Sequence, residues 1–369
     1  MLDLHTIGAG GGSIAHVDAA GAFKVGPVSA GAVPGPAAYG HGGTAATVTD
    51  ANLVLGRLDP DNFLGGNMSL DTQASERVIN ELAAELGLAP DETAEGVIAL
   101  LNANMANAIR ARTVQKGIDP RQYALVAAGG AGPLHAAEVA KLLSIPEVIV
   151  PPHPGINSAE GLLTTDLKYE VVRTAFLTTS SSSPAQLREG IAEIRKEFEA
   201  QLIDEQVDPH DASFEASTDA RYVGQGYELK LALDEALLGS NDFDPLVTAF
   251  HDVHQREYGH SFKGAPVELV NLRVTALVEV PKIAEPACPT GEDLSAALIR
   301  ESDAIFRVDE TLSAHKTAFY NREKLPVNQS FAGPAIVLQT DSTVVIPPGC
   351  SATLTSSDVI IISIGKAGK

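Results

Sequence analysis

The sequence contains only two cysteines, Cys288 and Cys350, which lie far apart along the chain. Neither belongs to a Cys-x-x-Cys pair and neither has a base nearby in sequence. We therefore expect no disulfide framework, no thiolate metal site and no cysteine nucleophile. Long apolar runs are also missing, because none reaches the ~18 residues that a membrane span requires. The first residues lack a basic stretch followed by an apolar one, so no export signal is evident. Together these absences predict a cytoplasmic protein.

Basic residues are scarce as well. The chain has 26 lysines and arginines against 47 aspartates and glutamates, a net charge of −21. A surface this acidic repels phosphate backbones, which argues against nucleic-acid binding. A small anionic ligand remains compatible with the composition, because local backbone dipoles can outweigh the overall field.

What the sequence does contain is a mixture of helical and extended patterns over 369 residues, enough for two domains. A Thr/Ser-rich linker begins at Thr178, and a boundary near residue 175 separates an α/β domain (1–175) from a β-rich α+β domain (176–369). Apolar spacing predicts helices at 73–87, 91–116, 133–143, 184–204 and 244–258, and strands at 123–128, 147–151, 213–223, 226–233, 266–280, 335–339, 343–346 and 359–364.

Residues 123–151 are the clearest unit of the chain. A short apolar strand, the turn Gly129-Gly-Ala-Gly132, a helix and a second strand predict a β-loop-α-β unit with parallel strands. Glycines let a ligand approach bare backbone, and a helix N-terminus offers free N–H groups. A plain strand-to-helix turn explains the same residues equally well. The loop matches neither the phosphate loop GxxxxGK[ST] nor the dinucleotide fingerprint GxGxxG.

Two segments nearer the start carry weaker patterns. Gly8-Ala-Gly-Gly-Gly-Ser13 resembles a phosphate cradle, but Ser13 stands where a third fingerprint glycine belongs, which favours a packed glycine hairpin. In Thr47-Val-Thr-Asp-Ala-Asn52, either Thr49 or Asp50 caps the helix that follows, or Asp50 serves a Mg-nucleotide or a substrate.

Two polar patterns lie in the second half. His251, His254, Glu257 and His260 recur every three residues, so several share a helix face that is able to bind a metal. An exposed or packed polar face explains them better, because no HExxH is present and Gly259 ends the helix. Arg221-Tyr-Val-Gly-Gln-Gly-Tyr-Glu228 is either a hairpin with a salt bridge or a substrate or interface loop.

Taken together, the segments resemble the hydantoinase A/oxoprolinase family. The matching stretches run in family order across nearly the whole chain: HTIGAGGGSIAHVD (5–18), VGPVSAGAVPGPAAYGHGGTAATVTDANLVLGRL (25–58), ALVAAGGAGPLHAAEVA (124–140), VPPHPGINSAEGLL (150–163), RYVGQGYEL (221–229), VELVNLRV (267–274) and GPAIVLQTDSTVVIPPG (333–349).

The resemblance implies an α/β fold: a partial actin-like domain of the acetate kinase/sugar kinase/Hsp70/actin type, followed by a β-rich C-terminal region. It implies that Gly129, Gly130 and Gly132 bind the adenosine side of ATP. It also places Asn52 among the cofactor-binding residues, and His135 and Asp50 in the catalytic site. ATP and Mg are the implied cofactors, with no protein metal ligand assigned.

The chain departs from the family in two respects. Relatives carry an N-terminal region with two Asp-x-Gly-Gly-Thr loops that hold the ATP phosphates and metal, and neither loop occurs here. We therefore expect an incomplete site that a separate N-terminal hydantoinase A segment completes. Glu160 stands where relatives often have an apolar residue, so it should be exposed or paired.

The leading expectation for function is part of an ATP-dependent cyclic-amide hydrolase that works with a B-type subunit and is inactive alone. Phosphorylation of the amide oxygen would make it a leaving group and let water open the ring. The alternatives are a ketone carboxylase subunit and a non-catalytic assembly module. Since a partial actin-like domain exposes sheet edges, oligomerisation is also expected.

Overall fold

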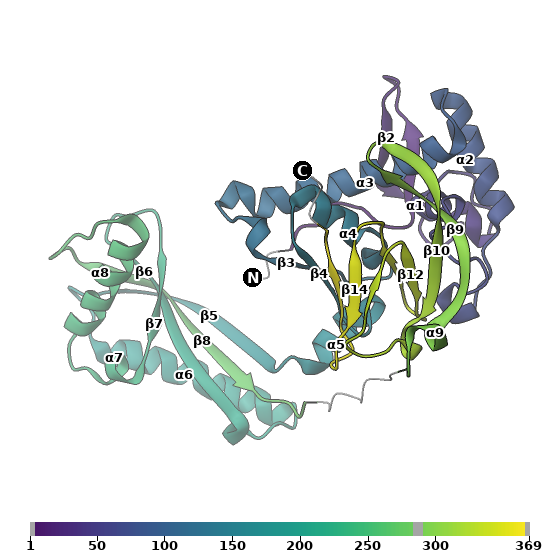
Figure 1. Cartoon of the computed structure of the whole chain (residues 1–369). Helices are drawn as coiled ribbons and strands as arrows, with labels where there is room; N and C mark the ends of the chain where they lie inside the picture. The colour runs from purple at the N-terminus through teal and green to yellow at the C-terminus, as the bar shows by residue number, and fades with distance from the viewer. Residues whose placement is uncertain (1–3, 283–290, 366–369) are drawn as a thin grey trace. The chain divides into compact units, whose positions relative to one another are not determined.

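The structure, a computed structural model, describes residues 4–282 and 291–365 and divides into two compact units (Figure 1). The first unit contains the described residues up to Glu160 and again from Gly291 onward. The second unit contains Gly161–Lys282. The boundary predicted from the sequence, near residue 175, grouped all of 176–369 into one domain. The division in the structure is different. The strands after Leu298 instead pair with strands of the first unit. Cys288 lies outside the described residues.

Helices dominate the N-terminal part of the first unit, and their ends follow from the sequence. The carboxylate of Asp71 accepts a hydrogen bond from Ala74 N at the start of α2, and Gly87 ends that helix with φ 69°. Val78, Ile79 and Leu82 are buried on its apolar face, as the helical spacing predicts. The elements of this part are β1 (Ser13–Val17), β2 (Phe23–Ser29), α1 (Val48–Val54), α2 (Thr72–Leu86) and α3 (Pro90–Arg112).

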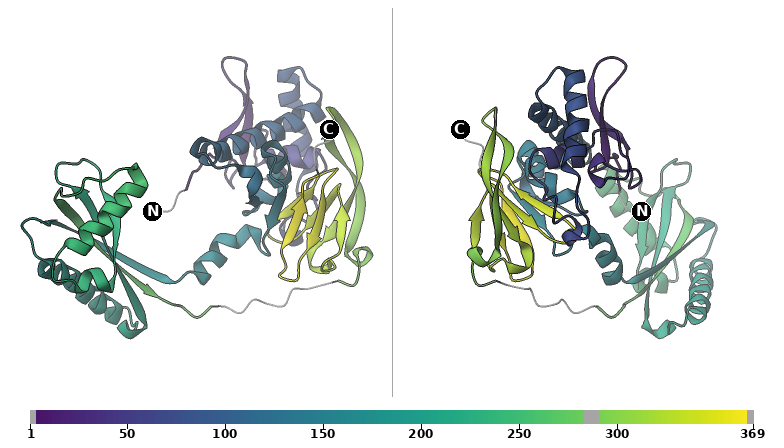
Figure 2. Two further views of the ribbon diagram at one scale, coloured as in Figure 1. Left: turned by 60° about the vertical axis from the view of Figure 1, so that its left-hand side comes forward. Right: turned by 90° about the vertical axis from the view of Figure 1, so that its right-hand side faces the viewer.

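A five-stranded sheet of order β11-β14-β15-β4-β3 joins the middle of the chain to its end. Strands β3 and β4 are parallel, which confirms the predicted β-loop-α-β unit, and β15 runs antiparallel to β4. Both views in Figure 2 show the yellow C-terminal strands beside the teal segment that contains β4, the partner of β15. The elements are β3 (Ala124–Val126), α4 (Gly132–Leu143), β4 (Glu147–Val150), α5 (Asn157–Thr164), β11 (Ser330–Ala332), β14 (Ser351–Leu354) and β15 (Ile360–Ser363).

A second sheet of the first unit has the order β13-β12-β10-β9. Its central strand β12 is buried along its whole length, which explains the uninterrupted apolar run of its sequence. The apolar faces of this sheet, the five-stranded sheet and α4 share buried core residues such as Val139, Val337 and Ile362. The elements are α9 (Leu294–Ala297), β9 (Leu298–Val308), β10 (Thr311–Asn321), β12 (Ala335–Leu338) and β13 (Thr343–Ile346).

The second unit is an antiparallel sheet of order β5-β8-β6-β7 with helices and its own core. The period-two patterns predicted its strands, and Phe198 and Phe250 bring two helices onto the buried face. Its elements are β5 (Leu167–Thr178), α6 (Pro184–Asp204), β6 (Ala212–Tyr222), β7 (Leu229–Leu233), α7 (Glu235–Gly239), α8 (Asp244–Tyr258) and β8 (Val267–Val278).

Three smaller expectations concern features outside the sheets. Glu160 is partly exposed and lies 2.8 Å from His153 Nδ1, which confirms that it is paired. Cys350 is a buried free thiol. Across residues 4–282 and 291–365, every helix is too short or too polar to span a lipid bilayer.

Candidate functional site

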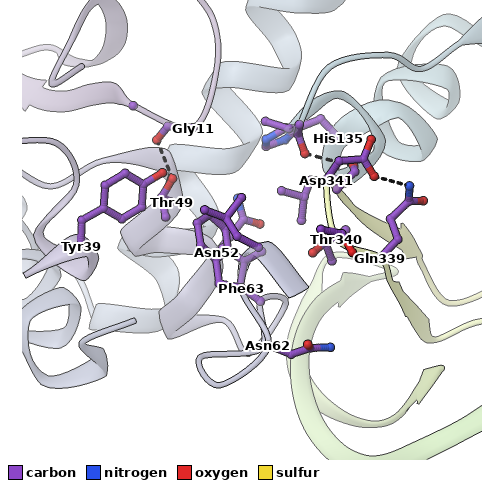
Figure 3. A pocket seen from close by; sticks show the side chains of 18 residues that line it. Gly11, Tyr39, Thr49, Asn52, Asn62, Phe63, His135, Gln339, Thr340 and Asp341 are labelled. Carbon is purple, nitrogen blue, oxygen red and sulfur yellow. Dashed lines mark hydrogen bonds between the residues drawn. The ribbon is translucent and has the colours of Figure 1, made fainter. Parts of the chain in front are cut away.

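A cavity of about 240 Å³ in the first unit brings together three of the segments that the sequence singled out (Figure 3). The glycine loop before β1, the helix α1 and the start of α4 each contribute to its wall. The loop between β12 and β13 closes another side. The lining residues are Gly11, Gly12, Tyr39, Thr49, Asn52, Leu58, Asn62, Phe63, Leu64, Gly130, Ala131, Leu134, His135, Gln339, Thr340, Asp341, Ser342 and Thr343.

The glycines at the start of α4 have three different places. Gly129 makes the turn with φ +85°, and its N–H donates to the carbonyl of Pro154. Gly130 lines the cavity, and its carbonyl accepts a hydrogen bond of 3.1 Å from Ser342 Oγ. Gly132 is the first residue of α4, where no side chain caps the helix. The first turn of α4 therefore presents backbone N–H groups and a positive dipole end beside the cavity.

His135 lies in this first turn and is only 1% exposed. Its Nδ1 is 2.9 Å from Asn102 Oδ1, whereas its Nε2 is buried without a hydrogen-bond partner among the described residues. Burial and, to a smaller extent, the nearby charge of Arg57 together lower the pKa of His135 from 6.5 to about 4. The ring is therefore neutral at physiological pH, and its Nε2 remains unused by the described residues.

The depressed pKa of His135 predicts a pH-dependent loss of stability. Between pH 6.5 and 4 the unfolded histidine takes up a proton that the folded one rejects, so the free energy of unfolding falls as the pH falls. The difference between the two pKa values corresponds to about 3 kcal/mol. We expect His135→Gln to lose less stability than the wild type over this window, measured by urea denaturation at several pH values. Parallel pH profiles for the two proteins would contradict the buried neutral ring.

Asp50, expected in the catalytic site, does not line the cavity. It is fully buried, and its carboxylate accepts hydrogen bonds from the backbone N–H groups of Ala37, Ala38 and Thr47 and from the hydroxyls of Thr47 and Ser75. Thr47 rather than Thr49 is the N-cap of α1, and Asp50 completes its capping box. This geometry favours the capping alternative, since both carboxylate oxygens already have donors.

Thr49 and Asn52, from the same segment, do line the cavity. Thr49 Oγ1 donates to the carbonyl of Gly11 at 3.0 Å, which ties α1 to the glycine loop (Figure 3). Asn52 Nδ2 donates to Val48 O at 3.0 Å. In the loop itself, the Ser13 hydroxyl accepts from Gly10 N and donates to Gly8 O, so Ser13 closes a tight turn before β1. Gly11 and Gly12 thus belong both to this turn and to the cavity wall.

The residues from Gln339 to Thr343 were not among the predicted site residues. Asp341 in this loop is held by Gly155 N–H, which donates to Oδ2 at 2.7 Å, and by the Gln339 side-chain amide. Gln339 in turn accepts a hydrogen bond of 2.7 Å from the buried Arg322. The loop lies within the family-matching stretch 333–349, but its residues themselves form only a polar run between two apolar strands, a pattern that any surface turn shares.

The two polar patterns of the second half meet within the second unit, whereas the cavity is lined by residues of the first unit. His254 is fully buried, with Nδ1 at 2.7 Å from the carbonyl of His260 and Nε2 at 3.1 Å from Gln225 Nε2. The hydroxyl of Tyr222 lies 2.7 Å from His251 Nδ1. Arg221 forms ion pairs with Glu228 and Glu268. These contacts favour a packed polar cluster and a salt-bridged hairpin. Within the described residues, no group of three or more metal-binding side chains was found.

The cavity wall mixes polar and apolar side chains and carries little charge. Of the described residues that line it, Asp341 alone has a formal charge when His135 is neutral, and none is a lysine or arginine. The rest are hydroxyl and amide side chains, backbone groups, the rings of Tyr39 and Phe63, and the apolar side chains of Ala131, Leu58, Leu64 and Leu134. Such a wall suits a neutral polar ligand that is recognised by hydrogen bonds.

Fold and cavity together define a mixed α/β protein whose site lies between a glycine loop, a helix N-terminus and a C-terminal loop. Residues 1–171 match the hydantoinase/oxoprolinase family model, and residues 178–362 match that of the hydantoinase/oxoprolinase C-terminal domain. The chain belongs to the hydantoinase/oxoprolinase family, which confirms the resemblance that its motifs indicated.

Relatives with different activities are similar to this chain. The caprolactamase subunit alpha of Pseudomonas jessenii is 32% identical over 97% of this chain and 52% of the relative. The acetophenone carboxylase gamma subunit of Aromatoleum aromaticum is 33% identical over 94% of this chain and 49% of the relative. The chain thus spans about half the length of these curated relatives.

Two solved structures resemble the chain as well. A nucleotide-free acetone carboxylase, from work on ATP-dependent acetone carboxylation, matches with a TM-score of 0.81 and 25% identity, over 96% of this chain and 52% of that one. The ATP-dependent caprolactamase of Pseudomonas jessenii matches with a TM-score of 0.75 and 32% identity, over 99% of this chain and 53% of that one.

Proposed function

We propose that this chain supplies the nucleoside-binding part of an ATP-dependent hydrolase that opens cyclic amides. The cavity that joins Gly130 and the first turn of α4 to the loop 339–343 is the observation that supports this most directly. Relatives named 5-oxoprolinase and ATP-dependent caprolactamase favour the same reaction class. An actin-like arrangement of the first unit belongs to this proposal, since parallel β3 and β4 with α4 between them fit such a fold.

The cavity fits a nucleoside better than a triphosphate. Phosphates in proteins are commonly held by lysine, arginine or a metal ion, and the described residues of this cavity wall include no cationic side chain. Asp341, its one carboxylate, already accepts hydrogen bonds from Gly155 and Gln339. We therefore assign Mg and the phosphates to groups outside this cavity.

When bound, ATP supplies the phosphoryl group that activates the amide of a lactam-like ring: water adds to the activated carbon, the ring C–N bond breaks as the nitrogen takes up a proton, and a second water releases the phosphate as the carboxylate forms. The part of this chain is to bind and orient. Backbone N–H groups at the start of α4 and the neutral His135 hold the polar edge of the nucleoside, while Phe63 and Leu134 cover its apolar face.

Binding is tested with a variant that fills the cavity. Ala131 lines it and is partly exposed, so we expect Ala131→Leu to weaken binding of adenosine and of a non-hydrolysable ATP analogue at least ~10-fold by calorimetry, through steric exclusion. Ala84→Leu, on the exposed side of α2, is the matched control and should bind as the wild type does. Equal affinities for all three proteins would contradict the site. Absence of any nucleotide binding would instead favour a non-catalytic assembly module.

The chain is proposed to work with partner chains: a hydantoinase B-type subunit and the family's N-terminal hydantoinase A region. β3 is an edge strand of its sheet; Tyr123, just before it, is 58% exposed, and Val126, its last residue, is 59% exposed. An open edge with exposed apolar side chains favours pairing with another chain or self-association. Light scattering that shows a monodisperse monomer would contradict an oligomer.

The relatives also leave a ketone carboxylase as a second candidate, because acetone and acetophenone carboxylases are among them. ATP turnover by the chain with both partner regions separates the two. Stimulation by hydantoin or 5-oxoproline supports the hydrolase, and stimulation by acetone or acetophenone with bicarbonate supports the carboxylase. Turnover by the chain alone would contradict an incomplete site.

A further inference from the structure

A line of buried and partly buried side chains leads from Arg57 to the wall of the cavity. Arg57 Nη2 lies 2.7 Å from Glu95 Oε2, and Arg57 Nη1 lies 4.0 Å from Glu138 Oε1. The other oxygen of Glu138 accepts a hydrogen bond of 2.9 Å from Asn102 Nδ2. Asn102 Oδ1 is 2.9 Å from His135 Nδ1. The segment after α1 together with helices α3 and α4 thus brings polar groups into contact behind the cavity. Packing alone does not explain such a polar network.

These contacts determine where the proton of His135 lies. The Glu138 carboxylate next to Arg57 only accepts hydrogen bonds, so the atom of Asn102 that faces it is the donor Nδ2. Asn102 therefore presents its oxygen to His135, and an oxygen only accepts. The proton of the neutral ring is consequently on Nδ1, which leaves Nε2 as a hydrogen-bond acceptor.

His135 Nε2 is buried and has no hydrogen-bond partner among the described residues. His135 itself lines the cavity (Figure 3). A buried polar atom without a hydrogen bond destabilises a protein, and such atoms are rare unless a ligand or water supplies the partner. The partner must be a donor, because the ring does not become cationic at neutral pH.

We propose that Asn102 and Glu138 are positioning residues that hold His135 as the Nδ1–H tautomer, so that Nε2 accepts a hydrogen bond from a ligand O–H or N–H group. This inference rests on the function proposed above. If the ligand is adenosine, the donor is a ribose hydroxyl or the adenine amino group. The arrangement selects ligands with a donor at this point and disfavours those that present an acceptor there.

The tautomer is tested without any ligand. In the full chain with isotope-labelled histidine, NMR should show Nδ1 protonated and Nε2 unprotonated for His135 at neutral pH, with His135→Gln assigning the signals. Asn102→Leu should abolish this preference. Asn107→Asp, on the exposed side of the same helix, should leave it unchanged. A protonated Nε2 in the wild type, or an unchanged tautomer in Asn102→Leu, would overturn the proposal.

The ligand half is tested by adding adenosine and its analogues to the same samples. Adenosine should shift the Nε2 signal, and either the deoxyribose or the des-amino analogue should bind ~10-fold more weakly to the wild type but not to His135→Leu. An unmoved Nε2 signal at saturating adenosine would refute the contact. If adenosine and ATP fail to bind while the tautomer is as expected, the nucleotide assignment falls and the positioning role of Asn102 stands.

Discussion

Replacing Arg57 by methionine should lower the free energy of unfolding by about 3–5 kcal/mol. The side chains of Arg57 and Glu95 are only 2% and 6% exposed, and the pair is 2.7 Å apart. Arg57 also donates through Nε and Nη2 to the carbonyl of Ile305. Methionine fills similar space but leaves the Glu95 carboxylate buried without its cation, and an unpaired buried charge is strongly unfavourable.

The design of this test separates charge from packing. Burial raises the pKa of Glu95, whereas the nearby Arg57 and, to a smaller extent, Arg307 lower it. The loss in Arg57→Met should therefore shrink as the pH falls and Glu95 takes up a proton. The double variant Arg57→Met/Glu95→Leu should recover much of the stability, because it removes both charges. Urea denaturation at several pH values measures all three proteins. A loss below ~1 kcal/mol that does not depend on pH would show that the pair behaves like an exposed one.

The local elements of this fold were predictable, whereas their assembly was not. The helices α2 and α4 and the strands β3 and β4 follow from apolar spacing and from turn residues that lie next to one another in sequence. The pairing of β15 with β4 depends on residues far apart in the chain, and no short-range pattern encodes it. The Thr/Ser-rich linker that suggested the boundary lies inside the second unit, because the first unit is already interrupted after Glu160. The later return of the chain to the first unit has no signal in the sequence.

The same distinction applies to the cavity. Glycine loops and a strand-helix turn are visible in sequence, and Gly130, His135 and Asn52 do line one space. Their roles depend on partners that the sequence does not reveal, as the unused Nε2 of His135 and its contact with Asn102 illustrate. The loop 339–343 escaped prediction because a polar run between strands is common to most turns.

Replacing Asp50 should cause the second large loss of stability. The result decides whether Asp50 in the Thr47–Asn52 segment caps the helix or serves a ligand. Asp50→Ala removes the acceptor for five donors in a fully buried place, three of them backbone N–H groups. Each buried donor left unpaired destabilises by about 1–3 kcal/mol, so we expect a total loss of at least about 3 kcal/mol. Asp50→Asn should lose less, since one oxygen remains, although its new NH₂ group faces other donors.

The control is Asp71→Ala, which removes the N-cap of α2 and should lower stability by about 1 kcal/mol, since that carboxylate accepts one backbone hydrogen bond at the surface. Denaturant titration gives the stabilities, and calorimetry with adenosine gives binding at a temperature where each variant is folded. A structural Asp50 predicts a large loss of stability, with binding retained in the fraction of Asp50→Asn that is folded. If Asp50→Asn kept wild-type stability but lost the nucleoside, Asp50 would instead have to contact the ligand, and the capping interpretation would be wrong.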